Sequence, residues 1–240
     1  MIIAGPCSVQ DYKSTLEDAL ECKKMGIEYF RAGAFKPRTY PTSFQGLGKE
    51  GLEILSKVKK ETGLKIVSEI VDINHLPWYS DIDILQIGAR NCQNFELLKR
   101  VAEKSDKPVL LKRGFGMTID EFVGAADYLT AYGCSEVILC ERGIRTFENA
   151  TRNTLDLACV PLIHKHTNYK IIVDPSHGTG NSDLVLPMAY AALACGADGL
   201  MIEMTKNPDN AISDAAQTIN YEQMYKLLEN INYSKIKNNI

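Results

Sequence analysis

Six basic residues have the chemistry to bind a small anionic molecule together. They are Arg31, Lys36, Arg38, Arg90, Lys112 and Arg142. Arginine presents a planar fork that grips a phosphate or carboxylate through two parallel hydrogen bonds, whereas lysine acts as a mobile point charge. One anionic group would not require six cations, so the set indicates a substrate with more than one phosphate or carboxylate. The alternative is that each cation forms a structural ion pair with a nearby acid.

A second set of side chains has the donor chemistry of a transition-metal site. It comprises Cys7, His177, Glu203 and Asp214. A thiolate, an imidazole and two carboxylates suit Zn²⁺, Fe²⁺, Mn²⁺ or Co²⁺, and geometry and supply decide among these ions. Ordinary alternatives exist for three of the four. Cys7 could be a small buried hydrophobe, Asp214 a helix cap, and Glu203 the partner of an arginine.

Both sets follow short apolar segments that are typical of strands buried on both faces, because these are rich in Ile, Val and Leu. The segments cover residues 2–4, 29–32, 66–68, 84–87, 109–112, 137–139, 171–173 and 200–202. Helical patterns alternate with them, among them residues 14–25, 50–61, 118–132 and 181–195, and several stop just before a glycine. We expect the first of these helices to begin at Ser14 as its cap.

About eight such β-then-α units predict an α/β fold, a (β/α)8 TIM barrel that forms a single domain over residues 1–240. The alternative is an open doubly wound sheet, which would carry a glycine-rich phosphate loop after its first strand. The first strand here leads into Gly5-Pro6-Cys7-Ser8, which fits no such loop. In a barrel, the residues at the carboxyl ends of the strands meet on one face. The two sets, with Glu69 after the third strand, should therefore line one cationic bowl.

The composition excludes several other classes of protein. Hydrophobic residues make up 45% of the chain and charged residues 24%, which is ordinary for a soluble enzyme. The formal charge of −3 argues against a nucleic-acid binder, which needs clustered cations in excess. No apolar run is long enough for a membrane span, and no secretory signal is visible. Seven scattered cysteines without a CxxC pair indicate the reducing cytoplasm.

Other catalytic chemistries are less well supported by the residues. His75, His164 and His166 have no obvious nucleophilic partner, so a Ser-His or Cys-His hydrolase is a weak hypothesis. A Schiff-base aldolase is a better competitor, because Lys36 and Lys112 both follow strands of the expected barrel. Neighbouring cations would lower the pKa of such a lysine.

The sequences at the strand ends resemble 3-deoxy-D-arabino-heptulosonate-7-phosphate (DAHP) synthases, most closely the short microbial branch of that family. The matching stretches are Gly5-Pro6-Cys7-Ser8, Arg31-Ala-Gly-Ala-Phe-Lys-Pro-Arg-Thr39, Ser43-Phe-Gln-Gly-Leu-Gly48, Gln86-Ile-Gly-Ala-Arg90, Leu111-Lys-Arg-Gly114, Cys140-Glu-Arg-Gly-Ile-Arg145, Asp174-Pro-Ser-His177 and Ile202-Glu203. They run in order from residue 1 to about residue 220. The related octulosonate 8-phosphate synthases typically read Lys-Ala-Asn-Arg-Ser where this chain reads Lys36-Pro37-Arg38-Thr39, so this loop favours the DAHP branch.

The resemblance implies that phosphoenolpyruvate, erythrose 4-phosphate and water give DAHP and phosphate, the first step of the shikimate pathway. It assigns phosphoenolpyruvate to Arg90, Lys112 and Arg142, with Arg31 and Lys36 facing it. It assigns the phosphate of erythrose 4-phosphate to Arg38 and Thr39, and one divalent metal ion (Mn²⁺, Fe²⁺, Co²⁺ or Zn²⁺) to Cys7, His177, Glu203 and Asp214. Lys36 is the expected proton donor, Glu69 a weaker candidate for handling the water, and Cys7 is counted with them as catalytic.

The chain departs from the family pattern in three places. The family commonly has His-Pro after the metal-binding Glu, whereas this chain reads Met204-Thr205-Lys206-Asn207-Pro208, which puts the path toward Asp214 in question. Tyr40-Pro41-Thr42 varies near the sugar-phosphate loop. Met1 lies one residue before the first strand, so we expect no added regulatory domain and none of the feedback inhibition that it confers.

Two further expectations and two alternatives complete the hypothesis. The resemblance implies a homo-oligomer, a tetramer or a dimer, in the cytoplasm, with no nucleic-acid or membrane partner. The enzymatic alternative is a 3-deoxy-octulosonate 8-phosphate synthase that uses arabinose 5-phosphate. The non-enzymatic alternative is a barrel that has lost catalysis and acts as a binding partner. The intact set of cations and metal donors argues against the latter.

Overall fold

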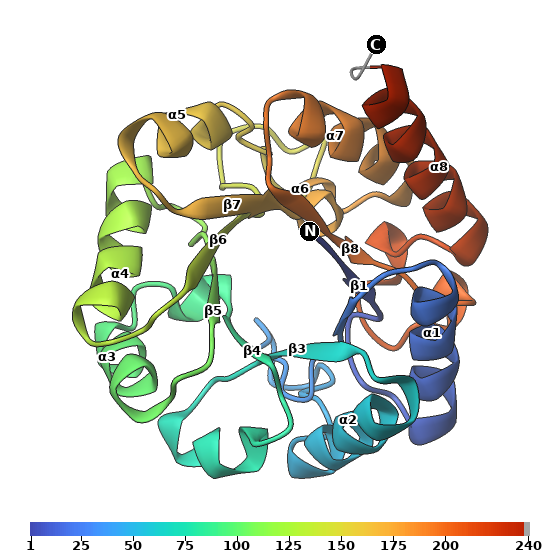
Figure 1. Ribbon diagram of the computed structural model, residues 1–240, viewed down its shortest axis with the longest axis horizontal. Coiled ribbons are helices and arrows are strands. Elements are labelled where there is room, and N and C mark those ends of the chain that lie inside the picture. The colour runs from blue at the N-terminus through green and yellow to red at the C-terminus, as the bar shows by residue number, and fades with distance from the viewer. Residues whose placement is uncertain (238–240) are drawn as a thin grey trace.

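Eight parallel strands close into one barrel in the order in which they occur along the chain (Figure 1). The computed structural model describes residues 1–237, with side chains through Ile231. The strands are β1 (Ile2–Gly5), β2 (Tyr29–Arg31), β3 (Lys65–Glu69), β4 (Ile84–Ile87), β5 (Val109–Lys112), β6 (Val137–Glu141), β7 (Lys170–Val173) and β8 (Gly199–Glu203). Pairing of β1 with β8 closes the ring. The predicted fold class, a (β/α)8 barrel, is confirmed.

Helices surround the barrel as an outer layer (Figure 1). They are α1 (Tyr12–Lys24), α2 (Lys49–Thr62), α3 (Phe95–Lys104), α4 (Ile119–Ala131), α5 (Cys159–His166), α7 (Ser182–Ala194) and α8 (Tyr221–Lys237). The short helix α6 (Pro175–Thr179) lies inside this layer instead, directly after β7. One repeat differs from the expected β-then-α pattern, because β3 is followed by the 3₁₀ helix η1 (Ile73–Tyr79). Pro77 lies inside it, and proline has no N–H for an α-helical hydrogen bond.

The strands are apolar on both faces because two layers of side chains pack against them. Alternate positions fill the barrel interior, where Ile3, Val67, Ile84, Leu110, Ile138, Cys140, Ile172 and Met201 form one cluster. The intervening positions pack outward against the helices, as Phe30, Ile66 and Leu111 do. The period of two along each strand therefore decides which side chains at a strand end point into the bowl.

Local signals fix where the helices begin and end. The first helix starts earlier than expected, at Tyr12, because Asp11 is its cap and accepts a hydrogen bond from the backbone N–H of Ser14. The expected cap at Ser14 was therefore wrong. Thr118 and Glu121 form a capping box at the start of α4, and Gly63 ends α2 in the left-handed conformation with φ 74°. These helices bring the chain back to the start of each following strand.

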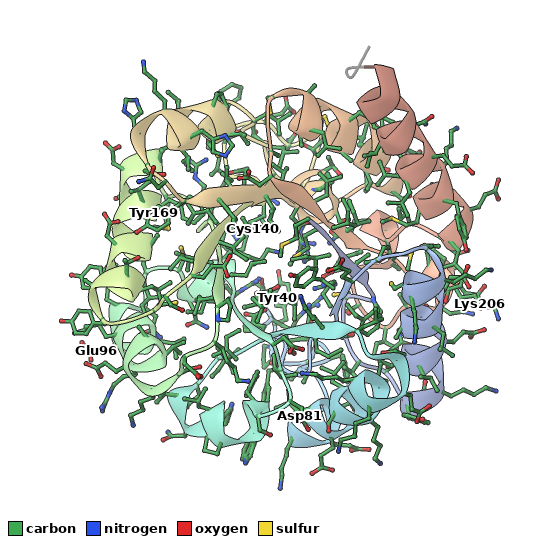
Figure 2. All side chains as sticks on the ribbon, in the orientation of Figure 1. Tyr40, Asp81, Glu96, Cys140, Tyr169 and Lys206 are labelled. Atoms are coloured by element: carbon green, nitrogen blue, oxygen red, sulfur yellow. The ribbon has the colours of Figure 1, made fainter. Side chains whose placement is uncertain are left out.

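The outer surface of the barrel is charged. Figure 2 shows Glu96 and Lys206 projecting away from the molecule, while Cys140 lies at the barrel wall, where it is fully buried. Within the described residues, no helix has the length and apolarity needed to cross a lipid bilayer.

Candidate active site

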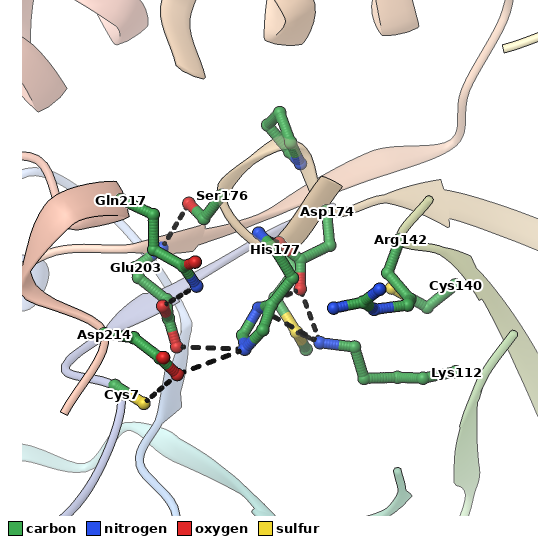
Figure 3. A network of polar contacts seen from close by, with 12 residues as sticks. Cys7, Lys112, Cys140, Arg142, Asp174, Ser176, His177, Glu203, Asp214 and Gln217 are labelled. Carbon is green, nitrogen blue, oxygen red and sulfur yellow. Dashed lines mark hydrogen bonds and ion pairs between the residues drawn. The ribbon is translucent and has the colours of Figure 1, made fainter. Parts of the chain in front are cut away.

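The donor atoms of Cys7, His177, Glu203 and Asp214 converge at the mouth of the barrel (Figure 3). Those of Cys7, Glu203 and Asp214 all lie within 4.8 Å of one another. The Cys7 Sγ is 3.0 Å from Oδ2 of Asp214. Nε2 of His177 lies 3.4 Å from Oε1 of Glu203 and 3.8 Å from Oδ2 of Asp214. We call these four residues the ligand cluster, and the structure brings them together as the sequence predicted.

Neighbouring strands bring three members of the ligand cluster together. Gly5 and Glu203 are register partners where β1 pairs with β8, and Cys7 follows two residues later. His177 lies in α6, directly after β7, and its backbone N–H donates to Oδ1 of Asp174, the cap of that helix. Oδ2 of the same carboxylate lies 2.7 Å from Nδ1 of His177, which turns Nε2 toward the cluster. Carboxylates commonly hold the second nitrogen of metal-binding histidines in this way.

Asp214 reaches the cluster through an unusual backbone conformation. It is the single non-glycine residue of the described chain with positive φ, at 54°, a region that aspartate tolerates better than most residues. It precedes the 3₁₀ helix η4 (Ala215–Gln217) and its side chain makes no capping hydrogen bond there, so the alternative interpretation of Asp214 as a helix cap is not supported. The Met204–Pro208 departure does not divert this segment, because Met204 pairs with Ile219 and brings the chain back.

The predicted cations share one cavity at the carboxyl ends of the strands. Its lining includes Arg31, Lys36, Arg38, Glu69, Arg90, Lys112 and Arg142, together with His177 and Asp214. Thr39 lies at the exposed rim, where its Oγ1 accepts a hydrogen bond of 3.1 Å from Nη2 of Arg90. The six cations and the ligand cluster therefore form one continuous site.

Two of these cations also form buried ion pairs with carboxylates. The anion-binding interpretation and the structural ion-pair interpretation of the sequence therefore both apply to them. Arg31 Nη1 is 2.8 Å from Oε1 of Glu203, and Lys112 Nζ is 2.5 Å from Oδ2 of Asp174. The Nε of Arg31 is buried without a hydrogen-bond partner, which leaves one donor for a ligand. Across the described residues, no carboxylate lies within ion-pair distance of Arg90 or Arg142.

The charges of the ligand cluster suit a divalent cation. Burial opposes ionisation of Glu203 and Asp214, but His177 and the nearby cations outweigh it and lower the pKa of both carboxyls. Burial also lowers the pKa of His177, which favours the neutral imidazole that can act as a ligand. Burial and the charge of Glu203 raise the pKa of Cys7 to about 12, so a thiolate there requires a cation bound to it. Donor chemistry and geometry both fit a metal ion.

The electrostatics of Lys36 argue against Schiff-base chemistry. Its Nζ donates to the backbone oxygen of Cys7 at 3.2 Å, and the side chain is buried. Burial opposes its charge, but Cys7 and the two carboxylates of the ligand cluster raise the pKa of the ammonium. The expectation that neighbouring cations lower the pKa of this lysine was wrong, because its anionic neighbours dominate. A protonated amine is a proton donor rather than a nucleophile.

Gln86 and Gly88 fix the position of the Glu69 carboxylate at the wall of the cavity. Its Oε2 accepts a hydrogen bond of 3.2 Å from Nε2 of Gln86. A side chain at Gly88 would have no room, because a Cβ there would lie 2.1 Å from Oε1 of Glu69. Burial raises the pKa of Glu69 although Lys36 and Lys112 oppose the shift.

Two polar residues of the site lie outside the strand-end pattern. Nη1 of Arg152 donates to Oδ1 of Asp214 at 3.2 Å and to Oε1 of Gln217 at 2.7 Å. Gln217 in turn donates to Oε2 of Glu203 at 2.5 Å (Figure 3). Arg152 lies in the β6–α5 loop and Gln217 in the 3₁₀ helix η4, both far along the chain from a strand end, so the strand-end pattern did not reveal them.

The model of the DAHP synthetase I family matches residues 1–237. The chain belongs to this family. A phospho-2-dehydro-3-deoxyheptonate aldolase of Thermotoga maritima is 48% identical over 95% of this chain and 68% of its own. A 2-dehydro-3-deoxyphosphooctonate aldolase of Desulfotalea psychrophila is 32% identical over 95% of this chain and 87% of its own.

Two solved structures from Thermotoga maritima have the same fold. A crystal structure of a phospho-2-dehydro-3-deoxyheptonate aldolase (DAHP synthase) superposes with a TM-score of 0.93, at 47% identity over 97% of this chain and 68% of that one. A truncated form of a DAHP synthase gives a TM-score of 0.90, at 43% identity over 97% and 85% of the two chains. The resemblance to DAHP synthases is confirmed, and the octulosonate enzymes are a sister branch.

Two arginines that follow neighbouring strands of this family member, Arg113 after β5 and Arg142 after β6, have different partners. Arg113 pairs with Glu141 at 2.9 Å and with Asp156 at 2.8 Å, outside the barrel wall. Arg142 faces the cavity, and its Nη1 donates to the backbone oxygen of Gly143 at 3.3 Å. The two arginines are similarly buried, at 2% exposure each, yet their partners differ.

We therefore predict opposite stability effects for the same substitution at these two positions. Arg113→Met should lower the free energy of unfolding by about 3–5 kcal/mol, because it leaves the buried carboxylate of Glu141 without its cation. Arg142→Met should change it by less than about 1 kcal/mol, because it strands no charge. Urea unfolding of the two variants in phosphate-free buffer measures the difference. Equal destabilisation would contradict this division.

Proposed function

We propose that this chain is a metal-dependent DAHP synthase that condenses phosphoenolpyruvate with erythrose 4-phosphate and water, giving DAHP and phosphate. The observation that carries the proposal is the single cavity in which six cations adjoin the ligand cluster. Two phosphorylated substrates account for the cations, and an aldehyde acceptor accounts for the metal donors. Membership of the DAHP synthetase I family supports the same reaction.

The cations divide between the two substrates by their position in the cavity. Lys112 at the end of β5, together with Arg90 and Arg142 just after β4 and β6, would hold the phosphate and carboxylate of phosphoenolpyruvate. Arg31 at the end of β2 and Lys36 in the loop that follows would face the same molecule. Arg38 and Thr39, farther along the β2–α2 loop, would hold the terminal phosphate of erythrose 4-phosphate.

The ligand cluster would hold one divalent ion, Mn²⁺, Fe²⁺, Co²⁺ or Zn²⁺, which supplies Lewis acidity for an aldehyde oxygen. Lys36 lies beside the cluster and would donate a proton from Nζ to the alkoxide that forms there. The new bond joins C3 of phosphoenolpyruvate to the aldehyde carbon of erythrose 4-phosphate. C2 then takes up water, Glu69 accepts a proton from that water, and phosphate leaves with the ester oxygen.

An assay of inorganic phosphate release tests the proposed reaction. With a divalent metal supplied, phosphoenolpyruvate and erythrose 4-phosphate should release phosphate, whereas arabinose 5-phosphate should support at most a few per cent of that rate. Preference for arabinose 5-phosphate would favour the octulosonate alternative. No release with either sugar would favour the non-catalytic barrel.

Chelation tests the metal dependence. Exhaustive chelation should abolish phosphate release, and Mn²⁺, Fe²⁺ or Co²⁺ should restore it. Cys7→Ala should lower the metal content of the purified protein at a fixed metal concentration at least tenfold, because ligands and their close partners typically contribute this much to affinity. Cys195→Ala serves as the matched control, since Cys195 lies at the end of α7 outside the cluster. Full activity after chelation would refute the metal site.

Arg38 tests the assignment of the two phosphates. Its Nη1 lies 3.9 Å from Oδ2 of Asp214, and Pro37 restricts the loop on which it stands. Arg38→Ala should raise the activation free energy for erythrose 4-phosphate by about 2–4 kcal/mol, measured as kcat/KM, with little change in KM for phosphoenolpyruvate. Arg100→Ala on the exposed face of α3 is the control. Loss of phosphoenolpyruvate binding with unchanged sugar affinity would show that the two sites are reversed.

The proposal includes a cytoplasmic homo-oligomer, a tetramer or a dimer. A hollow at the amino-terminal end of the barrel supports association, because partly exposed apolar side chains such as Met25, Leu193 and Leu228 line it. Burying such a surface against a second copy would remove it from water.

A further inference from the structure

Three arginine side chains contact the aromatic ring of Phe115. The guanidinium carbons of Arg90, Arg142 and Arg145 lie over this ring, at 5.3, 4.8 and 4.6 Å from its centroid. Each arginine comes from a different place in the chain, namely the turn after β4, the end of β6 and the loop that follows β6. Phe115 itself lies in the β5–α4 loop and lines the cavity.

No carboxylate is in direct contact with these three arginines. Within the part of the chain that the structure describes, no ion pair involves any of them. Burial lowers the pKa of Arg90, a shift that Glu69 opposes and that Arg152, Arg38 and Arg145 reinforce. Burial likewise lowers the pKa of Arg142, which Asp174 opposes and Arg152 reinforces. The protein must therefore hold these cations close together with carboxylates near them but none bonded to them.

An aromatic ring meets this requirement where a carboxylate would not. The face of the ring is electron-rich and attracts a guanidinium within about 6 Å. A carboxylate would occupy the N–H groups of the arginine and compete with an anionic substrate. A contact with the ring face needs no N–H group, so the donors stay available for a bidentate bond to phosphate or carboxylate.

We propose that Phe115 is a positioning residue that holds Arg90 and Arg142 through cation–π contacts, at full charge, for the anionic groups of phosphoenolpyruvate. Arg145 is the outer member of the same arrangement and adds its charge at the rim. This inference rests on the proposed function, since it concerns how the same cavity prepares for its substrate. In this proposal the ring acts through the arginines.

Substitutions at Phe115 separate the ring's electrostatic role from its packing. In metal-loaded protein, Phe115→Leu keeps an apolar side chain but removes the aromatic face, and it should raise the dissociation constant of phosphoenolpyruvate about tenfold by calorimetry. In the assay, KM for phosphoenolpyruvate should rise likewise, while kcat and KM for erythrose 4-phosphate change less than about threefold. Phe115→Trp should restore binding to within about threefold of the original chain. Phe147→Leu is the matched control, because Phe147 is 99% exposed.

The outcomes also distinguish this inference from the proposed reaction. Binding of inorganic phosphate and of phosphoenolpyruvate is measured without turnover, so weaker binding in Phe115→Leu supports the inference even if no DAHP forms. Unchanged binding in Phe115→Leu would overturn it. Equal loss in Phe115→Leu and Phe115→Trp, with unfolding transitions matching the original chain, would also overturn it, because the ring would then act by shape alone.

Discussion

The structure depends on concentrating positive charge at one end of a closed barrel. Eight parallel strands end on the same face, so polar residues at their carboxyl ends cannot avoid one another. Two unit charges 4 Å apart interact by about 4 kcal/mol at an effective dielectric constant near 20. Other parts of the fold must therefore offset the repulsion among the six cations of the cavity. The same positive potential attracts small anions, although the formal charge of the whole chain is −3.

The protein supports this charge in two different ways. Arg31 and Lys112 are paired with buried carboxylates, and these pairs join the cationic part of the cavity to the ligand cluster. Arg90 and Arg142 lie beside an aromatic ring and have no carboxylate within ion-pair distance among the described residues. The first arrangement fixes side chains next to the ligand cluster. In the second, the proposed substrate would supply the anionic partner that the two arginines lack.

Strand position explains most of what the sequence could predict. Cys7, His177 and Glu203 follow or end strands that are neighbours in any closed barrel, so their convergence follows from chain order. The direction of side chains is a second rule of the same kind. Cys140 is inside the barrel, so alternation sends Arg142 inward and Glu141 outward, where it meets Arg113. The same alternation explains why Arg113, next to Lys112 in the chain, is not one of the cavity cations.

What the sequence could not predict lies in the loops. Arg152 and Gln217 stand in segments that no strand orients, yet they bond to Asp214 and Glu203. The direction of the Asp214 carboxylate depends on a single positive φ, which local sequence does not specify, because most aspartates adopt negative φ. Similarly, three arginines meet at Phe115 only because three loops approach one another in space. Long-range contacts of this kind are set by closure of the whole barrel.

Direct contacts also connect the two positions proposed for the substrates. Arg90 donates to Thr39, whose neighbour Arg38 approaches Asp214 of the ligand cluster. A residue proposed to bind phosphoenolpyruvate, the loop proposed to bind the sugar phosphate and a proposed metal ligand are thus linked. The hydroxyl of Thr39 acts only as an acceptor toward Arg90, so its O–H can still donate to another group while the contact with Arg90 is kept. The loop that carries Arg38 and Thr39 is therefore tied to Arg90 on one side and to Asp214 on the other without using the hydroxyl hydrogen of Thr39.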